Sequence, residues 1–192
     1  MATTNLRQKW TYDEMVEKLP AESRYEIING ELNDMSPAPS PEHQSILKKL
    51  FKKLDSVVES LALGEVSFAP YDVILDQNNV VQPDIFFVSK ENTGKITKKG
   101  FGSVPDLVVE ILSPSSYYRD TVEKKDLYER FGVKEYWIID PANRVIEVFT
   151  LQENKYQLHV FVAEEGKVTS VVLAGFEADI NDIFGHIQPE NN

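Results

Sequence analysis

The chain has 192 residues and carries 20 Lys and Arg against 31 Asp and Glu, a formal net charge of −11. This charge argues against a protein that coats nucleic acid by bulk attraction, although it leaves room for a local basic site. The absence of cysteine excludes disulfides, thiolate zinc sites and cysteine nucleophiles. The length predicts a single domain over residues 1–192, with an ordered core from about residue 11 to residue 184.

The N-terminus, MATTNLRQKW, lacks the apolar segment of a signal peptide. No apolar run approaches the ~20 residues that a membrane span needs. The sequence therefore predicts a soluble, cytoplasmic protein with no membrane partner.

The first predicted elements are a short helix and a β-hairpin. Thr11 to Leu19 has a helical pattern, with Thr11 and Glu14 at the spacing of a capping box. From Arg24 to Met35, two short strands flank Asn29-Gly30, the dipeptide that a type I′ hairpin turn prefers. Glu26 alternates with its two apolar neighbours, so its side chain lies on the opposite face, toward either solvent or a site.

A long helix is predicted from Pro41 to Leu61, where apolar residues recur at helical spacing. His43, in its first turn, lies one helical step from Leu47 and should face inward. Two strands follow between Glu65 and Ile74.

The segments VVQPDIFFVS and LVVEIL are apolar runs typical of strands buried on both faces. An acid interrupts each of them, Asp84 in the first and Glu110 in the second. Burying an ionised carboxylate without a partner costs several kcal/mol or more, so each acid should face a cation, a hydrogen-bond network or a site. Between the two runs, the glycine- and lysine-rich residues 91 to 103 are predicted to form a mobile loop.

A helix after Glu110 offers a cation. Asp120, Lys124 and Tyr128 follow one another at four-residue steps and so share one helical face. A buried strand ending at Pro141 comes next. Three further strands, Arg144 to Thr150, Tyr156 to Val162 and Lys167 to Leu173, predict a C-terminal β-meander.

Asp84 and Glu110 are 110 − 84 = 26 positions apart, on strands that can be neighbours in one sheet. Mg²⁺ prefers one or two carboxylates together with water and phosphate oxygens. A nearby ammonium group such as that of Lys124 can orient water or stabilise developing negative charge. The set suits hydrolysis of a phosphodiester.

Each residue also has an ordinary structural interpretation. Asp84 can cap a neighbouring backbone group or lie at an exposed strand end, and Asp120 can cap its helix or form a surface pair with Lys124. His43 can be a satisfied helix-start histidine. The aromatic side chains Tyr128, Tyr136 and Trp137 suit a core or an interface.

Pro83-Asp84 followed by Glu110 is similar to the signature of the PD-(D/E)XK nuclease superfamily. The whole chain resembles the Uma-two family of restriction-endonuclease-like proteins, through RYEIINGEL, SPAPSPEHQSI, QPDIFFVS, PDLVVEILSPSS and GVKEYWIIDP together with the 120, 124 and 128 positions. The resemblance implies an α/β restriction endonuclease-like fold, with a central mixed β-sheet flanked by helices. It also implies that Asp84 and Glu110 are metal ligands.

The chain departs from the superfamily pattern at one position. The lysine expected two residues after the second acid is replaced by Leu112. The resemblance to the Uma-two pattern then implies that Lys124 serves from the adjoining helix, with Lys125, about 100° further round, as the alternative. Glu26 matches the early acid of the family, and His43 matches its helix-start histidine.

The resulting prediction is a Mg²⁺- or Mn²⁺-dependent DNA endonuclease that acts as a homodimer, with one site per strand. Its predicted catalytic residues are Asp84, Glu110, Lys124, Glu26 and His43. Two alternatives remain open. One is a nuclease fold that binds or regulates without catalysis, and the other is a metal-dependent hydrolase of a small phosphate ester.

Overall fold

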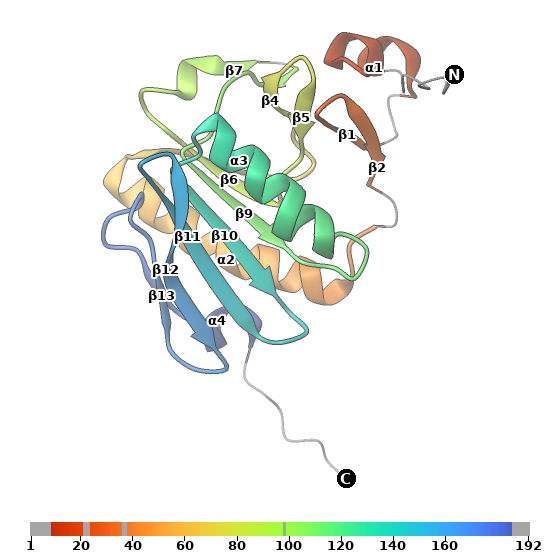
Figure 1. The fold of residues 1–192 in the computed structure, drawn as a ribbon. Coiled ribbons are helices and arrows are strands. Elements are labelled where there is room, and N and C mark those ends of the chain that lie inside the picture. Colours follow the sequence, from red (N-terminus) through yellow and green to blue (C-terminus); the bar gives the residue numbers. More distant parts are fainter. Residues whose placement is uncertain (1–8, 21–23, 36–37, 98, 186–192) are drawn as a thin grey trace.

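The computed structural model describes residues 9–20, 24–35, 38–97 and 99–185 (Figure 1). Its helical elements are α1 (Tyr12–Lys18), α2 (Pro41–Leu61), the 3₁₀ turn η1 (Thr93–Lys95), the π-helical turn η2 (Arg119–Lys124), α3 (Lys125–Phe131) and α4 (Ile180–Phe184). Its strands are β1 (Tyr25–Ile28), β2 (Glu31–Asp34), β3 (Gly64–Phe68), β4 (Val73–Asp76), β5 (Asn79–Val81), β6 (Ile85–Ser89), β7 (Ile96–Thr97), β8 (Gly100–Phe101), β9 (Leu107–Ile111), β10 (Glu135–Asp140), β11 (Val145–Gln152), β12 (Lys155–Ala163), β13 (Lys167–Thr169) and β14 (Glu177–Asp179).

The main sheet has the strand order β12-β11-β10-β9-β6-β3 within the described residues. β9 and β10 are parallel, because η2 and α3 cross between them, and the other neighbours are antiparallel. The predicted central mixed sheet is therefore confirmed.

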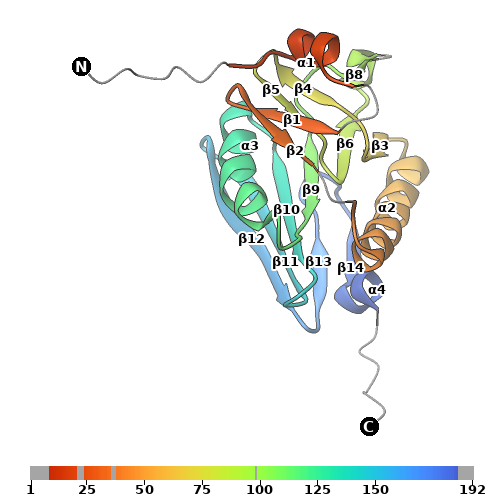
Figure 2. The same ribbon diagram turned by 90° about the vertical axis from the view of Figure 1, so that its right-hand side faces the viewer.

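Helices cover both faces of this sheet, with α2 on one side and α3 on the other (Figure 2). The alternation of β9 explains why its sequence is almost uninterrupted in apolar residues. Val109 packs with the α2 side chains, whereas Val108 packs with Leu127 of α3. Glu110 has the same parity as Val108, so its side chain points to the α3 face.

The predicted N-terminal hairpin is confirmed, with β1 and β2 paired in register around Asn29 and Gly30, both at positive φ. Its other edge pairs with β5, so the hairpin belongs to a second sheet of order β2-β1-β5-β4-β8-β7 among the described residues. α1 packs on that sheet through Tyr12 and Met15. Thr11 and Glu14 form the predicted capping box.

The sequence analysis expected VVQPDIFFVS to form one buried strand, and this prediction is wrong. β5 ends at Val81 in the second sheet, and β6 begins at Ile85 in the main sheet. Pro83 lies in the corner between them, where it has no N–H to contribute to either ladder. Asp84 therefore lies at the corner that joins the two sheets, not inside a buried strand.

The predicted C-terminal meander is correct for β10, β11 and β12 but wrong for Lys167 to Leu173. β13 leaves the main sheet and pairs with β14 instead. The chain turns through Glu164 and Gly166, both at positive φ, and this brings Val168 onto the α2 face of the core. Residues 91 to 103 are not simply a loop either, since their described part includes η1, β7 and β8.

None of the helices in the described part of the chain has the length and apolar character that crossing a membrane would require.

Candidate functional site

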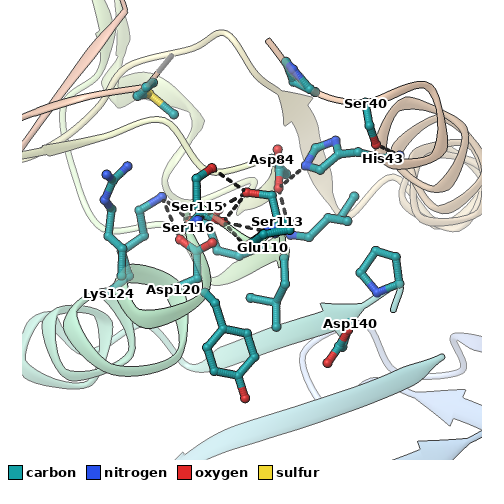
Figure 3. A pocket seen from close by; sticks show the side chains of 18 of the residues that line it. Ser40, His43, Asp84, Glu110, Ser113, Ser115, Ser116, Asp120, Lys124 and Asp140 are labelled. Atoms are coloured by element: carbon teal, nitrogen blue, oxygen red, sulfur yellow. Dashed lines mark hydrogen bonds and ion pairs between the residues drawn. The ribbon is translucent and has the colours of Figure 1, made fainter. Parts of the chain in front are cut away.

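A cavity of about 680 Å³ lies at the carboxyl ends of the parallel strands β9 and β10. Its lining combines the turn after β9, η2, the first turn of α2, the β1–β2 hairpin and the corner before β6. Ligand sites in α/β sheets commonly lie at the carboxyl ends of strands. Figure 3 shows that Asp84 and His43 lie on one side of Glu110, and that Lys124 and Asp120 lie on the other.

Asp84 is held in the cavity by two contacts through the same oxygen. Its Oδ2 accepts a 2.7 Å hydrogen bond from the Ile111 backbone N–H and lies 3.1 Å from His43 Nε2. β6 and β9 pair with Ile85 opposite Val109, so the same register brings Asp84 opposite Glu110 just beyond the paired residues. The two acids are therefore neighbours, as the sequence analysis expected.

His43 reaches Asp84 because Ser40 caps α2. The Ser40 hydroxyl accepts a 3.2 Å hydrogen bond from the His43 backbone N–H, which fixes the first helical turn. Burial lowers the pKa of the His43 imidazole, but the hydrogen bond and charge of Asp84 outweigh burial and leave that pKa raised. The pair therefore favours an imidazolium more than free histidine does.

Lys124 lies among three carboxylates. Its Nζ is 2.7 Å from Glu26 Oε1, 2.9 Å from Glu110 Oε1 and 3.5 Å from Asp120 Oδ1, and the residue is only 2% exposed. Burial alone would lower the pKa of Lys124, but the three carboxylates raise it well above its ordinary value. Lys124 is therefore a protonated hydrogen-bond donor in this arrangement.

Glu110 accepts a second hydrogen bond, 2.8 Å long, from the Tyr128 hydroxyl to the same Oε1 atom. Burial raises the pKa of Glu110 well above 4.5, and Lys124 opposes that effect. Burial likewise raises the pKa of Asp120, with Lys124 again opposing. Both donors to Glu110 come from the face that carries the 120, 124 and 128 positions, as the four-residue spacing predicts.

Glu26 enters from β1 and is fully buried. Its Oε1 accepts a 2.9 Å hydrogen bond from the Gln82 backbone N–H in addition to the Lys124 contact. Its Oε2 is buried without a hydrogen-bond partner among the described residues, and Arg119 Nη1 lies 3.9 Å away. The sequence analysis left open whether Glu26 faces solvent or a site, and its side chain faces the site.

The charges around the cavity fit a divalent cation. Four carboxylates (Glu26, Asp84, Glu110 and Asp120) face the cations Lys124 and Arg119, so negative charge exceeds positive charge there. No group of three or more His, Cys, Asp or Glu side chains in the described part of the chain is arranged to hold a metal ion. A metal here would be held by two carboxylates, with water and substrate oxygens completing its coordination, which is the mode that Mg²⁺ tolerates.

The structure thus brings all five predicted site residues to one cavity, while their roles stay predictions. Lys125, the alternative to Lys124, lies outside it, with its Nζ 3.4 Å from the centre of the Phe149 ring. The sequence analysis missed Arg119, and it interpreted Tyr128 only as a core or interface aromatic. The four-residue spacing from Lys124 was the available signal for Tyr128, whereas nothing in the sequence marked Arg119.

Comparisons with known proteins agree with this geometry. The family model described as "Uma2: Putative restriction endonuclease" matches residues 11–181. A crystal structure titled as a putative nuclease belonging to DUF820, from Anabaena variabilis ATCC 29413, superimposes with a TM-score of 0.72 at 21% sequence identity. That match covers 91% of this chain and 97% of the other, and it supports the restriction endonuclease-like fold. No curated protein matches the chain.

Proposed function

This chain belongs to the Uma2 family of restriction-endonuclease-like proteins, and we propose that it is a metal-dependent endonuclease that hydrolyses phosphodiester bonds in DNA. The observation that carries the proposal is the cavity in which Asp84, Glu110 and Lys124 meet. Two neighbouring carboxylates can hold a hard divalent cation, and that cation can bind a phosphate group. The buried ammonium of Lys124 lies beside them.

Asp84 and Glu110 would hold Mg²⁺ or Mn²⁺, and the bound ion would polarise a phosphoryl oxygen as a Lewis acid. The His43 contact and the Ile111 N–H orient Asp84 through Oδ2. Tyr128 orients Glu110 through Oε1.

Lys124 acts in this proposal as a donor and not as a base. Its raised pKa keeps the ammonium protonated, so its N–H groups position the attacking water and stabilise charge developing on the phosphate. Glu26 helps to hold the ammonium in place, because its Oε1 lies 2.7 Å from Lys124 Nζ. Glu26 and His43 therefore support the site through Lys124 and Asp84 respectively.

The test is cleavage of DNA with Mg²⁺, with Mn²⁺ and with a chelator, by the native protein and by Asp84→Asn. We expect Asp84→Asn to lower the rate by about 100-fold or more, the scale seen when one group that stabilises a transition state is removed. Asp106→Asn is the matched control, because Asp106 also accepts a backbone N–H (Ser89, 2.8 Å) but lies outside the cavity.

Thermal unfolding of both variants would show whether either loses its fold. Unchanged cleavage by folded Asp84→Asn would contradict the assignment. We also propose a homodimer, since a cut through both strands needs one site per strand. Sedimentation equilibrium tests this, and a monomer that cuts both strands would contradict it.

The geometry also favours one alternative, a nuclease fold that binds DNA without cleaving it. Lys124 already neutralises much of the carboxylate charge at 2.7 Å and 2.9 Å, and the net charge of −11 disfavours bulk attraction to a polyanion. Tight binding of DNA with no metal-dependent turnover would support that alternative. Turnover of a small phosphate diester but not of DNA would instead support the small-ester hydrolase.

A further inference from the structure

An exposed tyrosine lines the cavity. Tyr117 follows the Ser113–Ser116 turn and is 55% exposed, and it lines the same cavity as the buried Glu26, Glu110 and Lys124. Its ring makes no contact with another aromatic ring in the described part of the chain, and its hydroxyl has no hydrogen-bond partner there. The proposed roles of Asp84, Glu110 and Lys124 do not use it.

The cavity lining also contains apolar side chains. They include Met35, Pro39, Leu112, Pro114 and Pro141. The lining therefore combines charged groups with apolar side chains. A nucleotide likewise combines a flat base with a charged phosphate.

The size of the cavity excludes a base-paired duplex from its interior. A sphere of 680 Å³ is about 11 Å across, narrower than the ~12 Å major groove alone of B-DNA. A single unpaired nucleotide falls within the size range of ligands that such cavities hold.

The cavity offers few basic side chains that could contact the phosphates of DNA and so contribute to binding affinity. The basic side chains among the described lining residues are Arg24, Arg119 and Lys124. Lys124 is engaged by carboxylates, and Arg24 Nε donates to Gln82 at 3.1 Å. With a net charge of −11 and few basic side chains in the lining, contacts to the base are a further source of affinity. Stacking of a base on an aromatic ring needs no particular base identity.

We propose that Tyr117 stacks on an unpaired base of the DNA strand whose phosphate lies at Asp84 and Glu110. The protein then prefers single-stranded or locally opened DNA, because a paired base has to leave its stack before it can enter. This inference rests on the proposed function for the identity of the ligand as DNA.

The test measures binding to the native protein by fluorescence anisotropy with Ca²⁺, a hard cation that carboxylates also hold. Gel electrophoresis of the probe after each titration shows whether it stayed intact. The probes are a labelled single-stranded oligonucleotide and the duplex of the same sequence. We expect tighter binding of the single strand, and a loss of about 5- to 150-fold on Tyr117→Ala. Tyr117→Phe should retain affinity, since the ring does the stacking.

Tyr118→Ala is the matched control. Tyr118 is the next residue, is 65% exposed and does not line the cavity, so its removal should leave affinity unchanged. Equal affinity for the duplex, or equal effects of Tyr117→Ala and Tyr118→Ala, would overturn the inference.

A parallel cleavage assay with Mg²⁺ separates this inference from the proposed function. Binding of the single strand that depends on Tyr117, without cleavage, would leave the inference standing and refute the nuclease. Metal-dependent cleavage that Tyr117→Ala leaves unchanged would refute the inference alone. Failure to bind either probe would refute both.

Discussion

Lys124 shows how one side chain can hold a cluster of like charges together. Its Nζ contacts Glu26, Glu110 and Asp120, and each of these residues is buried. Removing one partner from a buried ionic cluster leaves charges that neither water nor a counter-ion compensates. The same group that we propose for catalysis therefore also stabilises the fold.

We expect Lys124→Met to lower the free energy of unfolding by about 3–5 kcal/mol at neutral pH, the cost of breaking a buried ion pair. Urea unfolding measures this. Lys125→Met is the control, because Lys125 lies outside the carboxylate cluster and its cation–π contact with Phe149 is worth about 0.5–1 kcal/mol. Equal losses in the two variants would show that the carboxylate cluster does not depend on Lys124.

The pKa of Glu110 leads to a prediction about pH. Burial raises that pKa well above 4.5, so above pH 4.5 the native state keeps a proton that the unfolded state has lost. The stability that Glu110 contributes is therefore present below pH 4.5 and is lost as pH rises toward its native pKa. Glu110→Gln stays neutral throughout and avoids this loss.

The metal-free Glu110→Gln variant should thus gain stability relative to the native protein as pH rises above 4.5 toward the raised native pKa of Glu110. Urea unfolding of both proteins at several pH values gives the difference directly. A difference that stays constant with pH would mean that Glu110 titrates alike in the folded and unfolded states.

The spacing of residues in the sequence predicted this cluster. The sequence could not, however, distinguish a buried acid at the site from a buried acid with a structural role. Glu135 is an acid at the start of the buried strand β10, and like Glu110 it is buried. Its carboxylate accepts hydrogen bonds from the Trp137 indole and from the Val171 and Val172 backbone N–H groups, at 2.6, 2.7 and 2.9 Å. The Val171 and Val172 donors lie 36 and 37 residues away in the sequence, and no local pattern encodes such contacts.

At the scale of elements, β6 positions the site because it follows the corner at Asp84 directly. Its other edge pairs with β3 in register from Gly64 to Phe68. A Cβ atom on Gly64 would overlap the Val88 carbonyl oxygen, so this close approach of two backbones requires glycine.

Gly64→Ala should therefore lower the free energy of unfolding by about 1–3 kcal/mol, the usual cost of forcing extra volume into a packed site. Chemical denaturation measures the loss. Gly102→Ala is the control, since a Cβ there meets nothing closer than 3.8 Å. A tolerated Gly64→Ala would contradict the tight β3–β6 pairing.

Local signals predicted the elements that local chemistry determines. The capping box of α1, the Asn29-Gly30 hairpin and the long amphipathic α2 all form as expected. The division of VVQPDIFFVS between two sheets and the pairing of β13 with β14 were not predicted. Both depend on which strand lies alongside, and that choice is made by the packing of distant segments.

For the whole molecule, the net charge and the basic side chains of the cavity act in opposite directions. A chain of net charge −11 repels DNA at long range, while three basic side chains line the described part of the cavity. Single-stranded binding loses about 0.7 in log K per neutralised phosphate for each tenfold rise in salt. Three contacts at most give a slope of about −2.

Anisotropy titrations of the native protein with Ca²⁺ at several salt concentrations measure this slope. A slope much steeper than about −2 would mean that a basic surface outside the cavity carries the binding. The modest slope is the signature expected when stacking supplies much of the affinity.

Metal binding by Asp84 and Glu110 is the central claim. Calorimetric titration of the metal-free protein with Mn²⁺ tests it most directly. We predict one saturable binding event in the native protein. Asp84→Asn should lose it while keeping the native unfolding transition, and Asp106→Asn should keep it. Absence of Mn²⁺ binding to the native protein, even with single-stranded DNA present, would contradict the account and favour a nuclease fold that binds without cleaving.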